Sequence, residues 1–188
     1  EVRRVAYSGG LEFCFDPQER WLGIASSEKD KDYALVPLDA SGPPLSSDLL
    51  IRRTIACDPS GKYVATRGQD PKLVEIRSPS TGALVKSLRH TDTVMKAVFD
   101  SSGESVATLD SGHNRLIHFW RVAGTGKEGE EIATREATDV FDIVFSPGGE
   151  YLAAMAHGLI DFHRWKPESL LSEARRRAPP RLVGVSPP

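Results

Sequence analysis

A sequence motif that occurs four times along the chain limits its fold more than any other feature. Each copy has an apolar alternating stretch, a tight turn rich in Asp, Ser, Pro and Gly, and a second apolar stretch. The copies are LEFCFDPQERWLGIAS, TIACDPSGKYVATRG, KAVFDSSGESVATLD and DIVFSPGGEYLAAMA. Their first turn residues, Asp16, Asp58, Asp100 and Ser146, are 42, 42 and 46 positions apart. Because a period of about 40 to 45 residues is typical of propeller blades, the spacing predicts stacked β-sheets.

The chemistry of the turns predicts a β-hairpin in each copy. Asp or Ser caps the turn with its side chain, Pro presets φ, and Gly takes the left-handed conformation. We expect a third strand at 33–38, 73–77, 116–122 and 159–165, and a fourth strand in two copies, at 84–88 and 131–135. Four short antiparallel strands make one blade, and neighbouring blades must cover its two faces.

The third-strand tryptophans and the turns together resemble the WD-repeat family, above all in FSPGGEYLAAMA, DPSGKYVATRG, Trp120 and Trp165. The resemblance implies an all-β, WD-type β-propeller with four blades of four antiparallel strands. The Trp-Asp pair of the family stands here as Trp120-Arg121 and Trp165-Lys166, and Arg89-His90 replaces its Gly-His pair. We therefore expect the family's hydrogen-bonded network of His, Ser/Thr, Asp and Trp to be mostly missing.

The blades are expected at about 1–50, 51–92, 93–138 and 139–166, with a short C-terminal helix and a Pro-rich tail at 167–188. The segment 2–7 is expected to be the outer strand of a neighbouring blade. It either completes the fourth blade of a small closed ring or belongs to a larger propeller, which is the favoured prediction because WD-like repeats mostly build larger rings.

The segment KPESLLSEARRRAPPRL resembles the closing helix after the last blade of large bacterial proteins that join a STAND-type NTPase to a WD propeller. This resemblance implies a sensor or protein-interaction module of a larger signalling or defence protein. Two alternatives stay open: an accessory propeller that shapes access to a separate hydrolase domain, and a stand-alone four-blade scaffold.

The charge balance favours a protein partner, or another domain of the same polypeptide, over nucleic acid or membrane. The chain has 24 basic and 26 acidic residues, a net charge of -2, and both signs are mixed along most of its length. No apolar stretch approaches the roughly 18 residues that cross a bilayer. We expect a cytoplasmic protein, in which Cys14 and Cys57 are buried free thiols.

The sequence predicts neither catalysis nor a metal or cofactor. It has no nucleophile elbow and no phosphate-binding loop, and no Cys or carboxylate spacing completes a metal site around its histidines. His118 and His163 each lie two residues before a tryptophan, so we expect equivalent packing roles for them. His90, in place of the family's Gly-His histidine, is expected to be structural.

Partner contacts are expected on one rim, in the loops between second and third strands and between blades. The candidate residues share a charged or titratable side chain in or beside these loops. They are Lys29, Asp30, Arg67, Asp70, Asp92, Asp110, His113, Arg115, Asp139 and His157. For Asp110 and Asp139 we also expect a turn-capping role.

Overall fold

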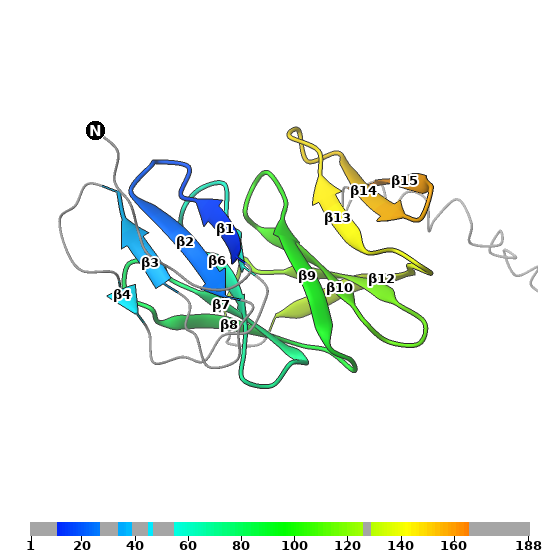
Figure 1. Ribbon diagram of the computed structural model, residues 1–188, viewed down its shortest axis with the longest axis horizontal. Coiled ribbons are helices and arrows are strands. Elements are labelled where there is room, and N and C mark those ends of the chain that lie inside the picture. Colours follow the sequence, from blue (N-terminus) through cyan, green and yellow to red (C-terminus); the bar gives the residue numbers. More distant parts are fainter. Residues whose placement is uncertain (1–10, 27–33, 39–44, 47–54, 126–128, 166–188) are drawn as a thin grey trace, which may run out of the picture.

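The computed structural model describes residues 11–26, 34–38, 45–46, 55–125 and 129–165. Within these ranges the chain forms four antiparallel sheets and no helix. Figure 1 shows the sheets side by side in chain order, from β1 in blue to β15 in orange. The all-β propeller fold expected from the repeats is therefore confirmed.

Each sheet is one blade, and its strands pair in chain order. Blade 1 contains β1 (Leu11–Phe15), β2 (Trp21–Ser26), β3 (Ala34–Pro37) and β4 (Leu45–Ser46). Blade 2 contains β5 (Ile55–Cys57), β6 (Val64–Arg67), β7 (Leu73–Arg77) and β8 (Leu84–Arg89). Blade 3 contains β9 (Val94–Phe99), β10 (Ser105–Asp110), β11 (Leu116–Arg121) and β12 (Glu130–Glu136). Blade 4 contains β13 (Asp142–Phe145), β14 (Tyr151–Ala156) and β15 (Leu159–Arg164).

The fourth strand of blade 1 corrects the expectation that only two blades have one. The strand β4 has two residues, which pair with Ala34 and Leu35 of β3. A segment this short has no alternating pattern, so sequence periodicity gave no signal for it.

The recurrent turns have the predicted geometry. In blade 2 the Asp58 carboxylate accepts hydrogen bonds from the backbone N–H groups of Ser60 and Lys62, at 2.9 and 3.0 Å. Gly61 follows with φ of 73°, a left-handed conformation that glycine adopts without steric cost. The corresponding residue of blade 1 is Glu19, whose φ is 55°. Asp58 is buried because these turns lie against the neighbouring blade.

The core lies between blades. All six residues of β10, the second strand of blade 3, are buried, because blades 2 and 4 cover its two faces. On the side of blade 4, the Phe119 ring stacks on the Trp165 ring with centroids 4.2 Å apart and planes at 11°. These contacts confirm that the blades are stabilised by stacking on one another.

The outer face of blade 4 is apolar and exposed. Val144, Met155, Ile160 and Phe162 are 57%, 40%, 53% and 71% exposed. Phe162 pairs with Ala153 in the register in which Phe119 pairs with Ala107, so it is the counterpart of the stacked Phe119. This face is thus equivalent to the one that blade 3 buries against blade 4.

The outer face of blade 1 is also apolar. Phe13 and Phe15 are 63% and 57% exposed on the side away from blade 2. The described part of the chain is therefore an arc with two open ends, as expected for a partial propeller.

A disulfide joins blades 1 and 2, which corrects the expectation of two free thiols. Cys14 of β1 and Cys57 of β5 are bonded across the joint, with their Cα atoms 5.8 Å apart. Sequence alone places both residues in apolar strands, but only the stacking of the blades brings their side chains together. Arg20 supports the same joint by donating hydrogen bonds to Asp16 and, at 3.0 Å, to the carbonyl of Gly61.

Three expectations lie outside the described residues: the outer strand at 2–7, the rim residues Lys29 and Asp30, and the helix and tail at 167–188. Within the described ranges, no helix is long and apolar enough to cross a membrane.

Candidate functional site: a polar rim above a buried hydrogen-bond network

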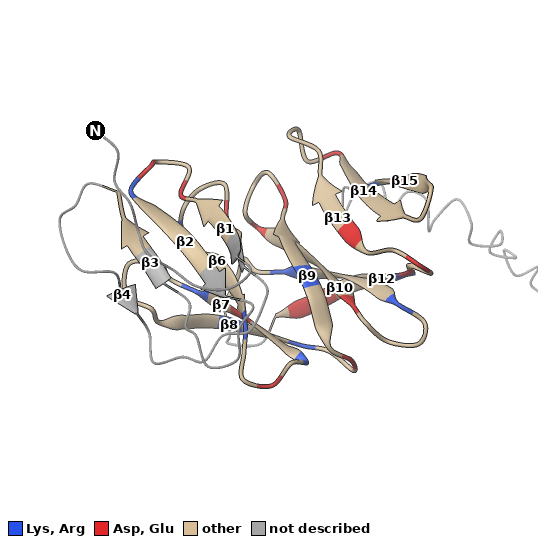
Figure 2. Ribbon diagram, in the orientation of Figure 1, with Lys and Arg blue, Asp and Glu red and all other residues tan. Residues whose placement is uncertain are grey.

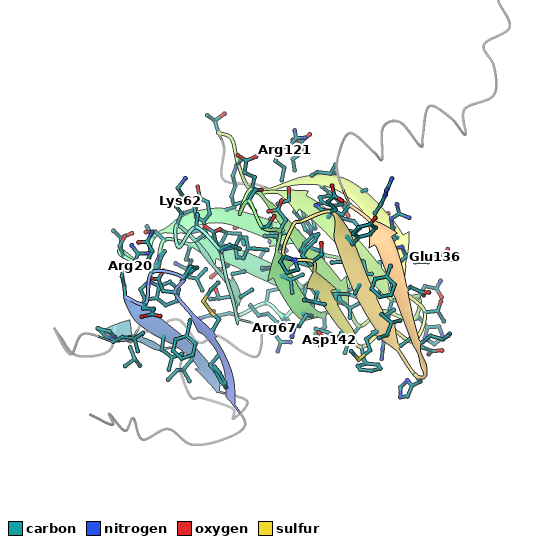
Figure 3. All side chains as sticks on the ribbon, turned by 90° about the horizontal axis from the view of Figure 1, so that it is seen from above. Arg20, Lys62, Arg67, Arg121, Glu136 and Asp142 are labelled. Atoms are coloured by element: carbon teal, nitrogen blue, oxygen red, sulfur yellow. A yellow bond between two sulfur atoms is a disulfide. The ribbon has the colours of Figure 1, made fainter. Side chains whose placement is uncertain are left out.

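Within the described residues, the loops that the sequence predicts for the rim lie together on one edge of the arc. The backbone N–H of His90 donates to Lys72 O, that of Ser111 to Thr93 O, and that of Ala137 to Arg115 O, each at 2.8 Å. Each bond joins a loop within a blade to a loop between blades. Figure 3 shows Arg67 and Asp142 at this edge and Lys62 and Arg121 at the opposite one.

Five of the candidate residues expose their side chains on this rim, and we call them the rim surface: Asp70, Asp92, His113, Asp139 and His157. Asp70 forms a loose ion pair with Arg89 at 3.4 Å, and the His157 ring contacts the Phe141 ring edge-on at 5.4 Å. In Figure 2, acidic and basic residues are interspersed over the described strands and loops. The rim surface therefore presents three carboxylates and two imidazole rings.

Two further candidates, Arg67 and Arg115, hold neighbouring blades together. The Arg67 guanidinium donates to the carbonyl of Val94 at 3.2 Å, and that of Arg115 to the carbonyl of Val140 at 2.5 Å. Both acceptors lie at or just before the first strand of the next blade. A substitution at either arginine would disturb blade packing as well as the rim.

Below the rim, blade 3 contains a continuous chain of hydrogen bonds. Trp120 Nε1 donates to Thr108 Oγ1 at 2.9 Å, and the Thr108 hydroxyl donates to His90 Nε2 at 2.7 Å. His90 Nδ1 then donates to the carbonyl of Leu88 at 3.1 Å. The expectation that the His, Ser/Thr, Asp and Trp network is mostly missing is therefore wrong for blade 3, because Arg89 replaces only the glycine before His90. The structural role expected for His90 is confirmed.

Burial, followed by the charge of the nearby His118 ring, lowers the pKa of His90 to about 4. His90 is therefore neutral at neutral pH, which fits its bonds: one ring nitrogen donates to a carbonyl and the other accepts from Thr108.

Asp110, the remaining buried candidate, belongs to a second set of polar contacts beside this network. Its Oδ1 accepts from the backbone N–H of Leu116 at 2.8 Å and of Gly112 at 3.3 Å, so the expected capping role is confirmed. Its Oδ2 lies 3.1 Å from His118 Nε2, and His118 Nδ1 lies 2.6 Å from Glu131 Oε1. A histidine thus stands between two carboxylates inside blade 3.

The sheet register corrects the proposed equivalence of His118 and His163. His163 pairs with Leu152, whose counterpart in blade 3 is Val106, and Val106 pairs with Trp120. His163 therefore stands where blade 3 has Trp120, because the loop before β15 is shorter than the loop before β11. Burial, followed by the charge of Arg135, lowers the pKa of His163.

Sequence reasoning missed Thr108 of this network and Glu131, which contacts His118 beside it. Thr108 had a usable signal, since it is a polar residue in a strand where covered blade faces favour small apolar ones. Glu131 had none, because a one-residue bulge at Ile132 of β12, opposite Phe119 and Trp120 of the paired strand, decides which way it faces. Within the described ranges no group of three or more His, Cys, Asp or Glu could hold a metal ion.

The fold and its rim define the class: a partial WD-type β-propeller with a polar loop rim. No protein-family profile matches the sequence, and no curated protein matches it either.

Solved structures do match. A chain of the mitotic checkpoint complex superposes with a TM-score of 0.70 at 16% identity, over 85% of this chain and 50% of that one. The β-propeller domain of Cps50 (Swd1) from Myceliophteria thermophila gives 0.66 at 14%, over 87% and 54%. Hydrazine synthase of Kuenenia stuttgartiensis gives 0.63 at 15%, over 87% and 49%. At these identities the likeness shows the fold alone, and this chain spans about half the length of each.

Proposed function

We propose that this chain is part of a non-catalytic propeller that binds a protein partner, or another domain of its own polypeptide, through the rim surface. The observation that carries the proposal is that two groups of polar side chains differ in their burial. Thr108, Asp110 and His118 are buried and bonded within blade 3, whereas Asp92 and His113 are exposed on the rim above them. Exposed polar loops on a rigid scaffold are where binding residues concentrate.

Apolar blade faces serve a different purpose. Inside the arc they are covered by the next blade, and the exposed faces of blades 1 and 4 are equivalent to those covered faces. We propose that further blades of a longer polypeptide cover them. The half-length match to known propellers supports this, since those chains contain about as much sequence again.

The proposed setting is a larger signalling or defence protein in which the propeller is the sensor and a STAND-type NTPase lies elsewhere in the same polypeptide. Its support is the resemblance of the segment after Trp165. Sequencing the reading frame around the chain tests it: a phosphate-binding loop in the same frame is expected, and a hydrolase domain there would replace this setting with the accessory-propeller one.

The binding role is tested with two matched double variants. Asp92 and His113 lie in adjacent loops, since a Cβ built on the neighbouring Gly112 would be 2.7 Å from Asp92 Oδ2. The variant Asp92→Ala/His113→Ala should weaken partner capture by roughly tenfold, which corresponds to about 1.4 kcal/mol. The control Lys62→Ala/Glu104→Ala changes exposed residues in turns of the opposite rim and should leave capture unchanged.

Capture is measured by cross-linking in cells that contain the natural polypeptide, with cross-linked peptides mapped by mass spectrometry. Melting temperatures of both variants should match that of the parent. Equal loss of capture in the control, or full capture by the rim variant, would refute the proposed surface.

The cytoplasmic location remains a proposal, and the disulfide provides its test. Disulfides persist in oxidising compartments and are rare in the cytosol. Alkylation of cell lysates under non-reducing conditions reports whether Cys14 and Cys57 are bonded in place, and a fully bonded pair would argue against the cytoplasm.

A further inference from the structure

We infer that His118 is a buried proton-binding site: it holds a second proton as an imidazolium, and that proton fastens the outer strand β12 to the Asp110 cap of the rim loop. The inference does not rest on the proposed binding role, because it follows from contacts inside blade 3.

The first step is a count of donors and acceptors. His118 Nε2 lies 3.1 Å from Asp110 Oδ2, and Nδ1 lies 2.6 Å from Glu131 Oε1. A neutral imidazole has one N–H and one lone pair, whereas an ionised carboxylate can only accept. Two contacts to ionised carboxylates therefore require both ring nitrogens to donate, which only the imidazolium does.

The second step is that both carboxylates keep their charge. The Glu131 side chain is 41% exposed, so water solvates its ionised form. Asp110 is buried, but its Oδ1 accepts the backbone N–H groups of Leu116 and Gly112. Hydrogen bonds from backbone N–H groups favour the charged form of a carboxyl group. The extra proton therefore resides on the histidine.

The third step concerns the other groups around the ring. His90 lies edge-on with its centroid 4.9 Å away and is neutral, so it adds no competing charge. Trp120 stacks at 6.0 Å and carries none. Among titratable side chains of the described residues, His90, Asp110 and Glu131 make the hydrogen-bond, ion-pair and ring contacts of His118. The buried Lys86 of β8 instead donates to the carbonyl of Thr125. Two negative charges face one positive charge.

The sheet is built to bring Glu131 to this position. Thr134 pairs with His118 and Ala133 with Phe119, but Glu131, not Ile132, pairs with Trp120. Without that bulge Glu131 would face the opposite side of the sheet, because side chains alternate along a strand. The bulge places its carboxylate on the face of His118.

Loss of the proton has a defined consequence. One ring nitrogen of His118 then has a lone pair, which faces a carboxylate oxygen and repels it. Glu131 is the carboxylate that can turn away into water, because its side chain is partly exposed. The hold on β12 therefore weakens as pH rises, while Asp110 keeps its two backbone bonds to the rim loop.

The test is nuclear magnetic resonance of the ring nitrogens in the full chain at neutral pH, with a matched pair of variants. In the parent, both nitrogens of His118 should carry protons. In Glu131→Gln the amide N–H₂ can donate to a neutral ring, so one nitrogen should lose its proton. The control Glu130→Gln alters the preceding, exposed residue, which pairs with Arg121, and should leave both protons in place.

A single ring proton on His118 in the parent at neutral pH would overturn the inference, and this measurement needs no variant to fold. A second readout is amide hydrogen exchange. Raising the pH from neutral to mildly alkaline should lower protection, corrected for intrinsic exchange rates, in β12 more than in β10. Equal loss in both strands would also overturn it.

Discussion

Reduction of the disulfide between Cys14 and Cys57 should remove a large part of the stability of blade 1. The bonded residues are 43 positions apart, and in the chain-entropy relation a closed loop of this size restricts the unfolded chain by about 4 kcal/mol. For a chain of this length that loss corresponds to a fall in melting temperature of about 8 to 16 °C. The first blade should respond most, since the bond holds β1 against β5 at the end of the arc.

The assay is urea unfolding with and without a reductant, followed by tryptophan fluorescence, with thiols counted by mass spectrometry in the same samples. The Cys14→Ala/Cys57→Ala variant is the control, because the reductant should not shift its midpoint. Hydrogen exchange should show β1 and β2 losing protection before β9 and β10. If the oxidised protein is verified and reduction leaves its midpoint unchanged, the assignment of stability to this bond is refuted.

Three further predictions concern the joints and the buried network. Between pH 6.5 and about 4, His90 binds a proton in the unfolded chain but stays neutral in the native protein. The free energy of unfolding should therefore fall by about 3 kcal/mol as the pH drops through that range. Denaturant titrations at several pH values measure this, and His90→Asn should lack it. Gly103→Ala should cost about 1 to 3 kcal/mol more than Gly82→Ala by chemical denaturation. Both glycines have positive φ, but only at Gly103 would a Cβ meet Asp58, at 1.9 Å. A similar cost at both would count against close blade contact. Phe119→Ala should cost about 3 to 5 kcal/mol, whereas the exposed counterpart Phe162→Ala should stay within about 0.5 kcal/mol in the same assay.

Local patterns in the sequence predicted the blades well because each pattern has a local cause. Asp58 and Gly61 belong to one turn, and the turn forms by short-range hydrogen bonds and a permitted backbone conformation. The third strands of blades 2 and 3 and their fourth strands were found within one or two residues for the same reason.

Contacts between blades and the register of paired strands could not be predicted in this way. Cys14 and Cys57 meet only when two sheets stack, and Glu131 faces His118 only through a bulge. Among the described residues, the predicted loops of blades 2, 3 and 4 do lie on one rim, since loop position follows from strand order. Arg67 connects blade 2 to blade 3 by donating to the carbonyl of Val94. The sequence of the loop that contains Arg67 does not reveal this contact.

The left-handed residue of the first turn sets a condition on whatever packs before blade 1. In blades 2, 3 and 4 this position is a glycine that nearly touches the turn of the preceding blade. Glu19 keeps the same backbone conformation but carries a long charged side chain. A sheet that packs before blade 1 must therefore accommodate a longer side chain at that height than blades 2, 3 and 4 present to the blades before them.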